Sequence, residues 1–232
     1  MKLSKRSDTV KMGRPPGSKN AGHDQRRREL ARSIIQVITT ENGVDSSLRE
    51  LARGAGVSPP TLRHYFQDRD GAIIAAFEEM LVQGSPYIES GATENIGELA
   101  SSLRWFAEQV VMGWGYGFGK SFSAGLSLGL LHEKRGPAFV NTLLEPSLQS
   151  LEARLHVHQS RGELREGDLR QFALSFASPL FLALFHQRNL GGDGCRPLDL
   201  QQFLEDHLDG FLRGYGPPSH SAKVPLAQDF LA

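Results

Sequence analysis

The segment SSLRELARGAGVSPPTLRHYF, residues 46 to 66, constrains the fold more than any other part of the chain. Ser47 is followed three residues later by Glu50, a capping-box pattern in which each side chain bonds the other residue's backbone N–H. Two glycines then end this first helix. Ser58 can cap a second helix, whose first turn holds two prolines where a backbone N–H has no helical partner. The segment therefore predicts two short helices joined by a tight turn.

Apolar residues on both sides of this segment complete a small helical domain. Upstream, from about Asp24, they recur at helical spacing, and that helix should stop at Asn42-Gly43. Downstream, Asp68 is placed to cap a longer helix through residues 71 to 84, with a break at Gly84-Ser85-Pro86. The side chains expected in the core between these helices are Leu48, Leu51, Ala52, Val57, Leu62 and Phe66. Two short helices joined by a glycine-bearing turn make a helix-turn-helix.

From about Arg28 to Phe77 the chain resembles the N-terminal domain of TetR/AcrR-type transcriptional regulators. The resemblance is carried by Leu-Ala in the first short helix, Gly-Val-Ser at the turn, Thr-Leu and Tyr-Phe in the second helix, and a basic residue at position 69. It implies an all-α fold with two domains. A helix-turn-helix, three-helix DNA-binding domain covers residues 23 to 68, and a larger helical ligand-binding and dimerisation domain covers residues 69 to 216.

The resemblance also implies how the second short helix meets DNA. The helix lies in the major groove and presents its first turns to base edges, where its two prolines offer only apolar contacts. Arg49 can reach a guanine edge, and Arg63 stands where family members often carry an aromatic residue. For Thr61 the alternative is a role at the helix start, and for Tyr65 it is a place in the core. The residues expected to contact DNA in this domain are Ser46, Ser47, Arg49, Pro59, Pro60, Thr61, Arg63, His64, Tyr65 and Arg69, with the serines, His64, Tyr65 and Arg69 assigned to phosphates.

Charge is distributed unevenly along the chain, although its formal net charge is zero. Residues 1 to 70 hold 14 Lys or Arg against 8 Asp or Glu, and residues 71 to 232 hold 12 against 18. A basic first third suggests a polyanionic partner, and a solvated basic face is the alternative.

Residues 1 to 22 form a basic arm without an apolar pattern, and we expect this arm to be disordered when free. Its stretch GRPPGSKN, residues 13 to 20, resembles an AT-hook, which enters A·T-rich minor grooves. Proline keeps the backbone extended, glycine permits close approach, and arginine is drawn to the negative potential of a narrow groove. A solubilising tail is the alternative. The arm residues expected to contact DNA are Lys11, Arg14 and Lys19.

The rest of the chain has the pattern of a helical domain that could hold a small molecule. Candidate helices lie near residues 94 to 112, 120 to 134, 137 to 160, 168 to 190 and 198 to 214, with an unstructured tail over residues 217 to 232. Several aromatic side chains could line an apolar effector pocket, and ordinary core packing is the alternative for each. The pocket candidates are Trp105, Phe106, Trp114, Phe122, Phe139, Phe172 and Phe176.

The last two predicted helices are apolar on more than one side, so each needs two partners. In the family that the chain resembles, the last two long helices pair across a two-fold axis as a four-helix bundle. A symmetric dimer places two recognition helices about 34 Å or more apart, which implies a palindromic operator in double-stranded DNA. The dimer candidates are Leu180, Leu184, Phe203, Leu208, Phe211 and Leu212.

Composition argues against secreted and membrane proteins. Cys195 is the only cysteine, so no intrachain disulfide is expected, and no cleavable apolar leader indicates secretion. The longest apolar stretch, residues 174 to 185, is too short to cross a bilayer. We therefore expect a cytoplasmic protein without a membrane partner.

The sequence indicates neither a catalytic nor a metal site. The stretch GWGYGFGKSF, residues 113 to 122, contains Gly-Lys-Ser but carries Trp114 where a phosphate-binding loop needs glycine. His156 and His158 lie two residues apart, which does not place both on one face of a helix. No nucleophile, base and orienting acid can be placed together, so we expect neither an enzyme nor a cofactor.

These features favour a homodimeric, sequence-specific regulator of transcription, a repressor that a small apolar or aromatic effector releases from its operator. Two alternatives remain. A nucleoid-type protein of low specificity would bind any A·T-rich duplex. A helical carrier or enzyme with a vestigial DNA domain would bind or convert its ligand without any linkage to DNA.

Overall fold

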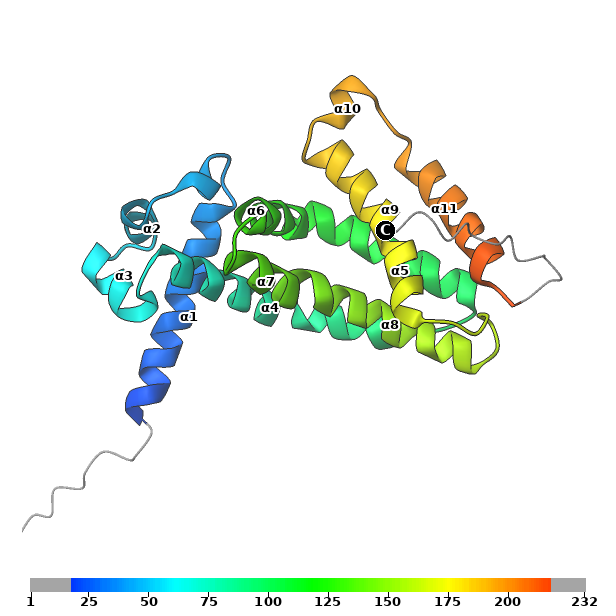
Figure 1. Ribbon diagram of the computed structural model, residues 1–232, viewed down its shortest axis with the longest axis horizontal. Helices are drawn as coiled ribbons and strands as arrows, with labels where there is room; N and C mark the ends of the chain where they lie inside the picture. The colour runs from blue at the N-terminus through cyan, green and yellow to red at the C-terminus, as the bar shows by residue number, and fades with distance from the viewer. Residues whose placement is uncertain (1–17, 218–232) are drawn as a thin grey trace, which may run out of the picture.

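The computed structural model describes the backbone of residues 18–217 and the side chains of residues 21–217. Within this range every regular element is helical, which confirms the predicted all-α fold (Figure 1). A small N-terminal unit lies at one end of the molecule, and the last helices lie at the other (Figure 1).

Three helices and a short 3₁₀ turn make up the N-terminal unit. They are α1 (Ser18–Ile38), the turn η1 (Gly43–Asp45), α2 (Leu48–Gly54) and α3 (Pro59–Phe66). The two short helices are those that the sequence predicted. The core of the unit contains the six predicted side chains, with Leu51, Ala52, Leu62 and Phe66 buried and Leu48 and Val57 half-buried.

The predicted caps of the two short helices are confirmed. The Ser47 N–H donates to Glu50 Oε2 at 2.7 Å, and the Glu50 N–H donates to Ser47 Oγ at 3.3 Å. At the second helix, the Thr61 N–H donates to Ser58 Oγ at 3.2 Å. The turn between them passes through Gly56 at φ +66°, a left-handed conformation that glycine adopts without strain. Local bonds therefore fix the start of each helix in the pair.

α1 begins at Ser18 instead of about Asp24, so the last residues of the predicted arm are helical. These first turns are held to the unit by His23, whose ring stacks on Tyr65 of α3 with 4.8 Å between centroids. The contact joins distant parts of the chain, which is why the apolar spacing of α1 did not reveal it. Several predictions lie outside the described residues. They are the DNA contacts of Lys11 and Arg14 in the arm, the contact of the Lys19 side chain, and the tail over residues 218–232.

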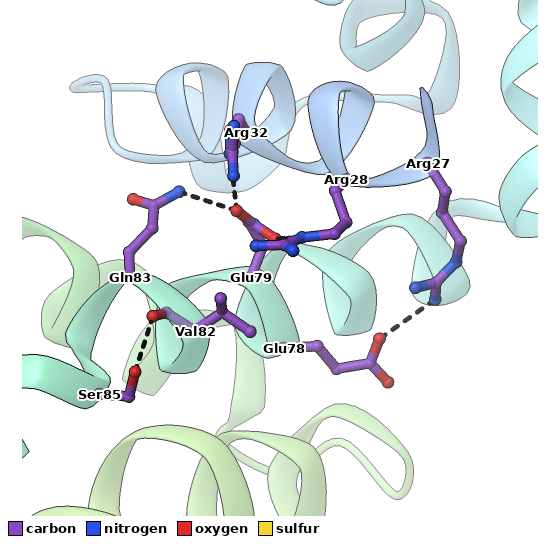
Figure 2. Close-up of polar contacts among 8 residues, drawn as sticks. All are labelled: Arg27, Arg28, Arg32, Glu78, Glu79, Val82, Gln83 and Ser85. Atoms are coloured by element: carbon purple, nitrogen blue, oxygen red, sulfur yellow. Dashed lines mark hydrogen bonds and ion pairs between the residues drawn. The ribbon is translucent and has the colours of Figure 1, made fainter. Parts of the chain in front are cut away.

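α4 (Arg69–Thr93) is the long helix that joins the two parts of the molecule. Its predicted cap is confirmed, because Asp68 Oδ1 accepts the Gly71 N–H at 2.8 Å. The predicted break at Gly84-Ser85-Pro86 is wrong, since the helix continues through the proline. Proline has no N–H to offer the Val82 carbonyl, and the Ser85 hydroxyl donates to that carbonyl instead, at 3.0 Å (Figure 2).

The C-terminal part consists of α-helices and two π-helical segments. They are α5 (Leu99–Gly113), η2 (Trp114–Phe118), α6 (Gly119–Gly129), α7 (Arg135–Phe139), η3 (Val140–Leu144), α8 (Glu145–Ser160), α9 (Leu169–Arg188), α10 (Gly192–Cys195) and α11 (Leu200–Tyr215). The glycine-rich connection after α5 is helical as well, and it bends at Gly117, where φ is +122°. α8 packs between α4 and α9, and α11 packs against α9 and α5.

A buried arginine fixes the end of α4 to α8. Arg154 is 0% exposed and donates to the carbonyls of Gly91 and Glu94, at 2.7 and 2.5 Å. It also donates to Ser102 Oγ of α5 at 2.7 Å, and the Trp105 ring lies 4.8 Å from its guanidinium. Burial lowers the pKa of Arg154 to about 10, so the side chain stays charged at neutral pH. A cation suits the carbonyl end of a helix, and this one ties three helices together.

Candidate nucleic-acid interface

α2 and α3 present polar and basic side chains on their outer sides. Leu62 and Phe66 point into the core, so the opposite side of α3 reaches solvent. Of the predicted DNA contacts on these two adjoining helices, Arg49, Pro60, Arg63 and His64 are exposed, and Pro59, Thr61 and Tyr65 are half-buried. The capped helix pair thus offers a fixed surface with three exposed arginines, Arg53 being the third.

Arg69 has a role within the domain that the sequence did not indicate. Its Nε donates to the Ser46 carbonyl at 2.7 Å, and its Nη2 donates to the Val44 carbonyl at 2.6 Å. These charge-assisted bonds tie the start of α4 to the turn before α2. The phosphate contact expected of Arg69 stays a prediction, and the guanidinium is already held by backbone carbonyls.

Two hydroxyl groups of the predicted interface belong to helix caps. Ser47 Oγ accepts the Glu50 N–H, so its own proton remains available to a phosphate oxygen. Thr61 Oγ1 lies 2.8 Å from Ser58 Oγ at the start of α3. The second contact supports the helix-start role that was the alternative for Thr61.

Three arginines of α1 form ion pairs with α4. Arg28 Nε donates to Glu79 Oε2 at 2.9 Å, and Arg32 Nε donates to Glu79 Oε1 at 2.6 Å (Figure 2). Glu79 is only 3% exposed. Burial raises the pKa of Glu79, but the bonds from Arg28 and Arg32 outweigh burial and hold this pKa below its ordinary value. Arg27 pairs nearer the surface with Glu78, at 3.1 Å between Nη2 and Oε2 (Figure 2).

The basic excess of the first third lies mostly in its arm. Residues 1 to 22 hold six Lys or Arg and one Asp, whereas residues 23 to 70 hold eight Lys or Arg and seven Asp or Glu. The folded helix-turn-helix is therefore close to neutral. Attraction to a polyanion through net charge comes chiefly from the arm.

The aromatic side chains predicted to line a pocket pack in separate groups. Trp114 and Phe122 contact Phe118 and Phe181, with centroids 5.4 to 6.5 Å apart. The other predicted side chains also have packed partners: Phe139 contacts Phe122, Phe106 contacts Phe176, Phe172 contacts Tyr215, and Trp105 lies over Arg154. These contacts support the core alternative, because the rings fill the space that a pocket needs.

A hollow of about 360 Å³ lies between α5 and α11 instead. Of the seven predicted pocket residues, Phe176 is the one that lines it. Arg104 and Glu205 form a bidentate ion pair in its lining, with 2.6 Å between Arg104 Nη2 and Glu205 Oε2. The apolar side chains around it are Leu103, Ala107, Val111, Leu200, Leu204 and Leu208.

The predicted dimer residues lie mainly on the inner sides of α9 and α11. Leu180, Leu184, Leu208 and Phe211 are 1, 0, 6 and 4% exposed. The prediction is wrong for these four residues, which the chain's own core covers. Phe203 and Leu212 are half-buried. The outer side of α9 carries Leu174 and Leu182, which are 39% and 67% exposed.

Three side chains of the kind used in catalysis meet between α5 and the end of α8, although their spacing in the sequence does not place them together. His158 Nδ1 lies 2.6 Å from Glu163 Oε2, and His158 Nε2 lies 2.8 Å from Ser102 Oγ. Ser102 and His158 are 0% exposed, and Ser102 Oγ also accepts a bond from Arg154. The hydroxyl is closed to any substrate, so the set packs α5 against α8.

Across residues 18–217, no helix is long and apolar enough to cross a membrane. In the same part of the chain, no three His, Cys, Asp or Glu side chains are grouped to hold a metal ion. His156 is exposed and His158 is buried, so the two histidines point to different sides of α8 as their spacing predicted.

No protein-family model matches the chain. A stretch of 98 residues is 29% identical to the HTH-type transcriptional regulator BetI of Brucella anthropi. The match covers 38% of this chain and 50% of that regulator, so it spans half the length of this relative.

Solved structures are similar over most of their length. A protein described as a TetR-family transcriptional regulator from Mesorhizobium loti has a TM-score of 0.67 and 19% identity, over 84% of this chain and 98% of that one. FadR of Thermus thermophilus, a TetR-family repressor solved in complex with lauroyl-CoA, has a TM-score of 0.60 and 19% identity, over 87% and 100%. The chain thus has the helical fold of TetR-family transcriptional regulators, and part of its sequence is similar to that of an HTH-type regulator.

Proposed function

We propose that this protein is a DNA-binding transcriptional regulator that acts as a homodimer and represses transcription until a small apolar effector releases it. The observation that carries the proposal is the capped α2–α3 pair, which holds Arg49, Arg63 and His64 on exposed sides of two fixed helices. A helix held in this way fits the major groove and presents its first turns to base edges.

The proposed contacts divide into base reading and backbone binding. Arg49 is assigned to base reading, because an arginine can bond a guanine edge with two parallel hydrogen bonds. His64 and Tyr65, in the last turn of α3, are assigned to phosphates. The arm adds Arg14 in the neighbouring minor groove, and its positive charge strengthens binding to every sequence.

The proposed dimer uses the outer sides of α9 and α11. Leu174 and Leu182 are exposed on α9, and Phe203 and Leu212 of α11 are half-buried in the single chain. Contact with a second copy would remove these apolar side chains from water. A two-fold axis there would set the two α3 helices on a palindromic operator.

The proposed effector site is the hollow between α5 and α11. Its volume of about 360 Å³ falls within the range of small-molecule sites, about 300 to 1,000 Å³. Seven of its twelve lining residues are apolar and five are polar or charged, which favours a small molecule with a largely apolar surface and some polar groups. Such a ligand changes DNA binding only if it binds the DNA-competent and the released states with different affinities.

Fluorescence anisotropy of the full chain on DNA from upstream of its own gene tests the proposal, against a scrambled duplex and an A·T-rich duplex. We expect selective binding to the upstream DNA. Arg49→Ala should reduce discrimination at one base position by about 1–3 kcal/mol, whereas Tyr65→Phe should weaken binding to all sequences alike. Equal binding to every duplex would favour a nucleoid-type protein, and binding to none would contradict a DNA-binding role on these sequences.

Deletion of residues 1–17 tests the arm separately, because it leaves α1 intact. The deleted stretch holds five Lys or Arg and one Asp. Log affinity falls with log salt, and each phosphate contact makes this slope steeper by about 0.9. We therefore expect the deletion to make the slope shallower by about 1 to 4 per protomer. An unchanged slope would identify the arm as a solubilising tail.

A further inference from the structure

A histidine outside the predicted interface lies against the exposed end of α3. His23 of α1 stacks on Tyr65, with 4.8 Å between ring centroids and 27° between ring planes. The His23 ring is also edge-on to the His64 ring, with 6.0 Å between centroids, and the His64 and Tyr65 centroids lie 5.2 Å apart. The His23 side chain is 45% exposed, and His64 is exposed as well. We call these three residues the His23 cluster.

Little negative charge faces the His23 cluster. Asp24 Oδ1 lies 3.5 Å from His23 Nδ1, and the Asp24 side chain is itself 73% exposed. Among residues 21–217 it is the one carboxylate within ion-pair distance of either imidazole. Arg27, one turn further along α1, is paired with Glu78 of α4. With both imidazoles protonated, the cluster therefore holds two positive charges against one solvated carboxylate.

We propose that the His23 cluster binds a phosphate of the DNA backbone, and that this contact takes up protons on His23 and His64. Protonated imidazoles donate from both ring nitrogens, and the Tyr65 hydroxyl can donate as well. A negatively charged phosphate beside the two rings favours their charged forms. Histidine is the side chain that changes charge between about pH 5 and 8, so DNA binding and protonation are linked in the working range of a cell.

The position of the cluster favours DNA over a free anion. His64 and Tyr65 lie in the last turn of α3, the helix proposed for the major groove, whose ends flank the phosphate strands. His23 lies in the first turns of α1 and packs against the last turn of α3 at Tyr65. A DNA strand that runs past the last turn of α3 therefore meets His23 as well. The inference rests on the proposed DNA binding and adds a residue of α1 to that interface.

The test compares the affinity of the full chain for its upstream DNA at pH 6, 7 and 8, by fluorescence anisotropy in phosphate-free buffer at constant salt. His23→Phe keeps an aromatic ring against Tyr65 but cannot take up a proton. His64→Phe removes the protonation site of the other imidazole, and the double variant removes both sites. His156→Phe is the matched control, because His156 is an exposed histidine of α8, outside the cluster.

From pH 8 to pH 6 we expect the dissociation constant to fall about tenfold for the wild type and the His156 control, about threefold for either single cluster variant, and not at all for the double variant. Equal pH dependence in the wild type and His23→Phe would overturn the inference and leave DNA binding standing. If His23→Phe changed the dissociation constant by the same factor at every pH, the inference would also be overturned, because His23 would then contribute only by stacking. A wild type that binds no duplex would overturn both this inference and the proposed function.

Discussion

Substitution of Glu79 by glutamine isolates the ion pairs that join α1 to α4. Glu79 is 3% exposed, whereas the side chains of its partners Arg28 and Arg32 are 48% and 53% exposed. Glutamine keeps the volume, removes the charge, and turns its NH₂ group toward one of the two guanidinium groups. A hydrogen bond to a charged group contributes about 1.5–3 kcal/mol, and solvent at the arginines screens this value. We therefore expect the free energy of unfolding to fall by about 2 kcal/mol.

Glu78→Gln is the matched control, because it makes the same change one residue earlier at the surface. Glu78 and Arg27 are 50% and 37% exposed, and such a pair contributes about 0–1 kcal/mol. For a chain of this size, thermal unfolding followed by circular dichroism should show Tm lowered by about 4–8 °C for Glu79→Gln and by at most about 4 °C for the control. Equal shifts in the two variants would refute the claim that burial strengthens the Glu79 pairs.

Three other changes have defined outcomes. Arg154→Met should lower the free energy of unfolding by about 3–5 kcal/mol in urea titrations, because the Gly91 and Glu94 carbonyls lose a buried charged donor. The folded state holds the pKa of Glu79 below its ordinary value, so its contribution to stability is complete above about pH 4.3 and is lost as the pH falls through the lower folded-state pKa. Glu79→Gln should accordingly flatten the acid limb of the stability curve. Leu182→Glu, on the outer side of α9, should shift the protein from dimer to monomer in analytical ultracentrifugation while the helix content by circular dichroism stays the same.

The helix-turn-helix could be predicted because local bonds define it. Ser47 with Glu50, Ser58 with Thr61, and Asp68 with Gly71 each act across three residues, so the sequence alone contains both partners. The apolar spacing then identified the buried side of each short helix. The exposed residues of α2 and α3 follow from these two facts.

Features that depend on distant partners could not be predicted in the same way. Glu79 pairs with Arg32, which lies 47 positions away in the sequence, and Arg69 bonds the Ser46 carbonyl, which lies 23 positions away. The stack of His23 on Tyr65 is of the same kind, and it lengthens α1 beyond its apolar pattern. Sequence spacing shows that such side chains are present but not what they meet.

Two errors have other physical causes. Gly84-Ser85-Pro86 is a pattern that predicts a helix end, but the Ser85 hydroxyl satisfies the carbonyl that proline leaves without a donor. α9 is apolar on several sides, so hydrophobicity could not decide which side faces its own chain. Leu180 faces inward and Leu182 faces out, although both fit the same apolar pattern.

Selection of bound duplexes from a pool with a fully randomised central region tests whether α2 and α3 recognise a defined sequence, because it assumes no operator. We expect enrichment of one palindromic sequence, with half-sites about one helical turn or more apart, and loss of preference at one base position in each half-site for Arg49→Ala. Enrichment of A·T-rich duplexes without a defined sequence, or no enrichment at all, would contradict sequence-specific recognition by α2 and α3.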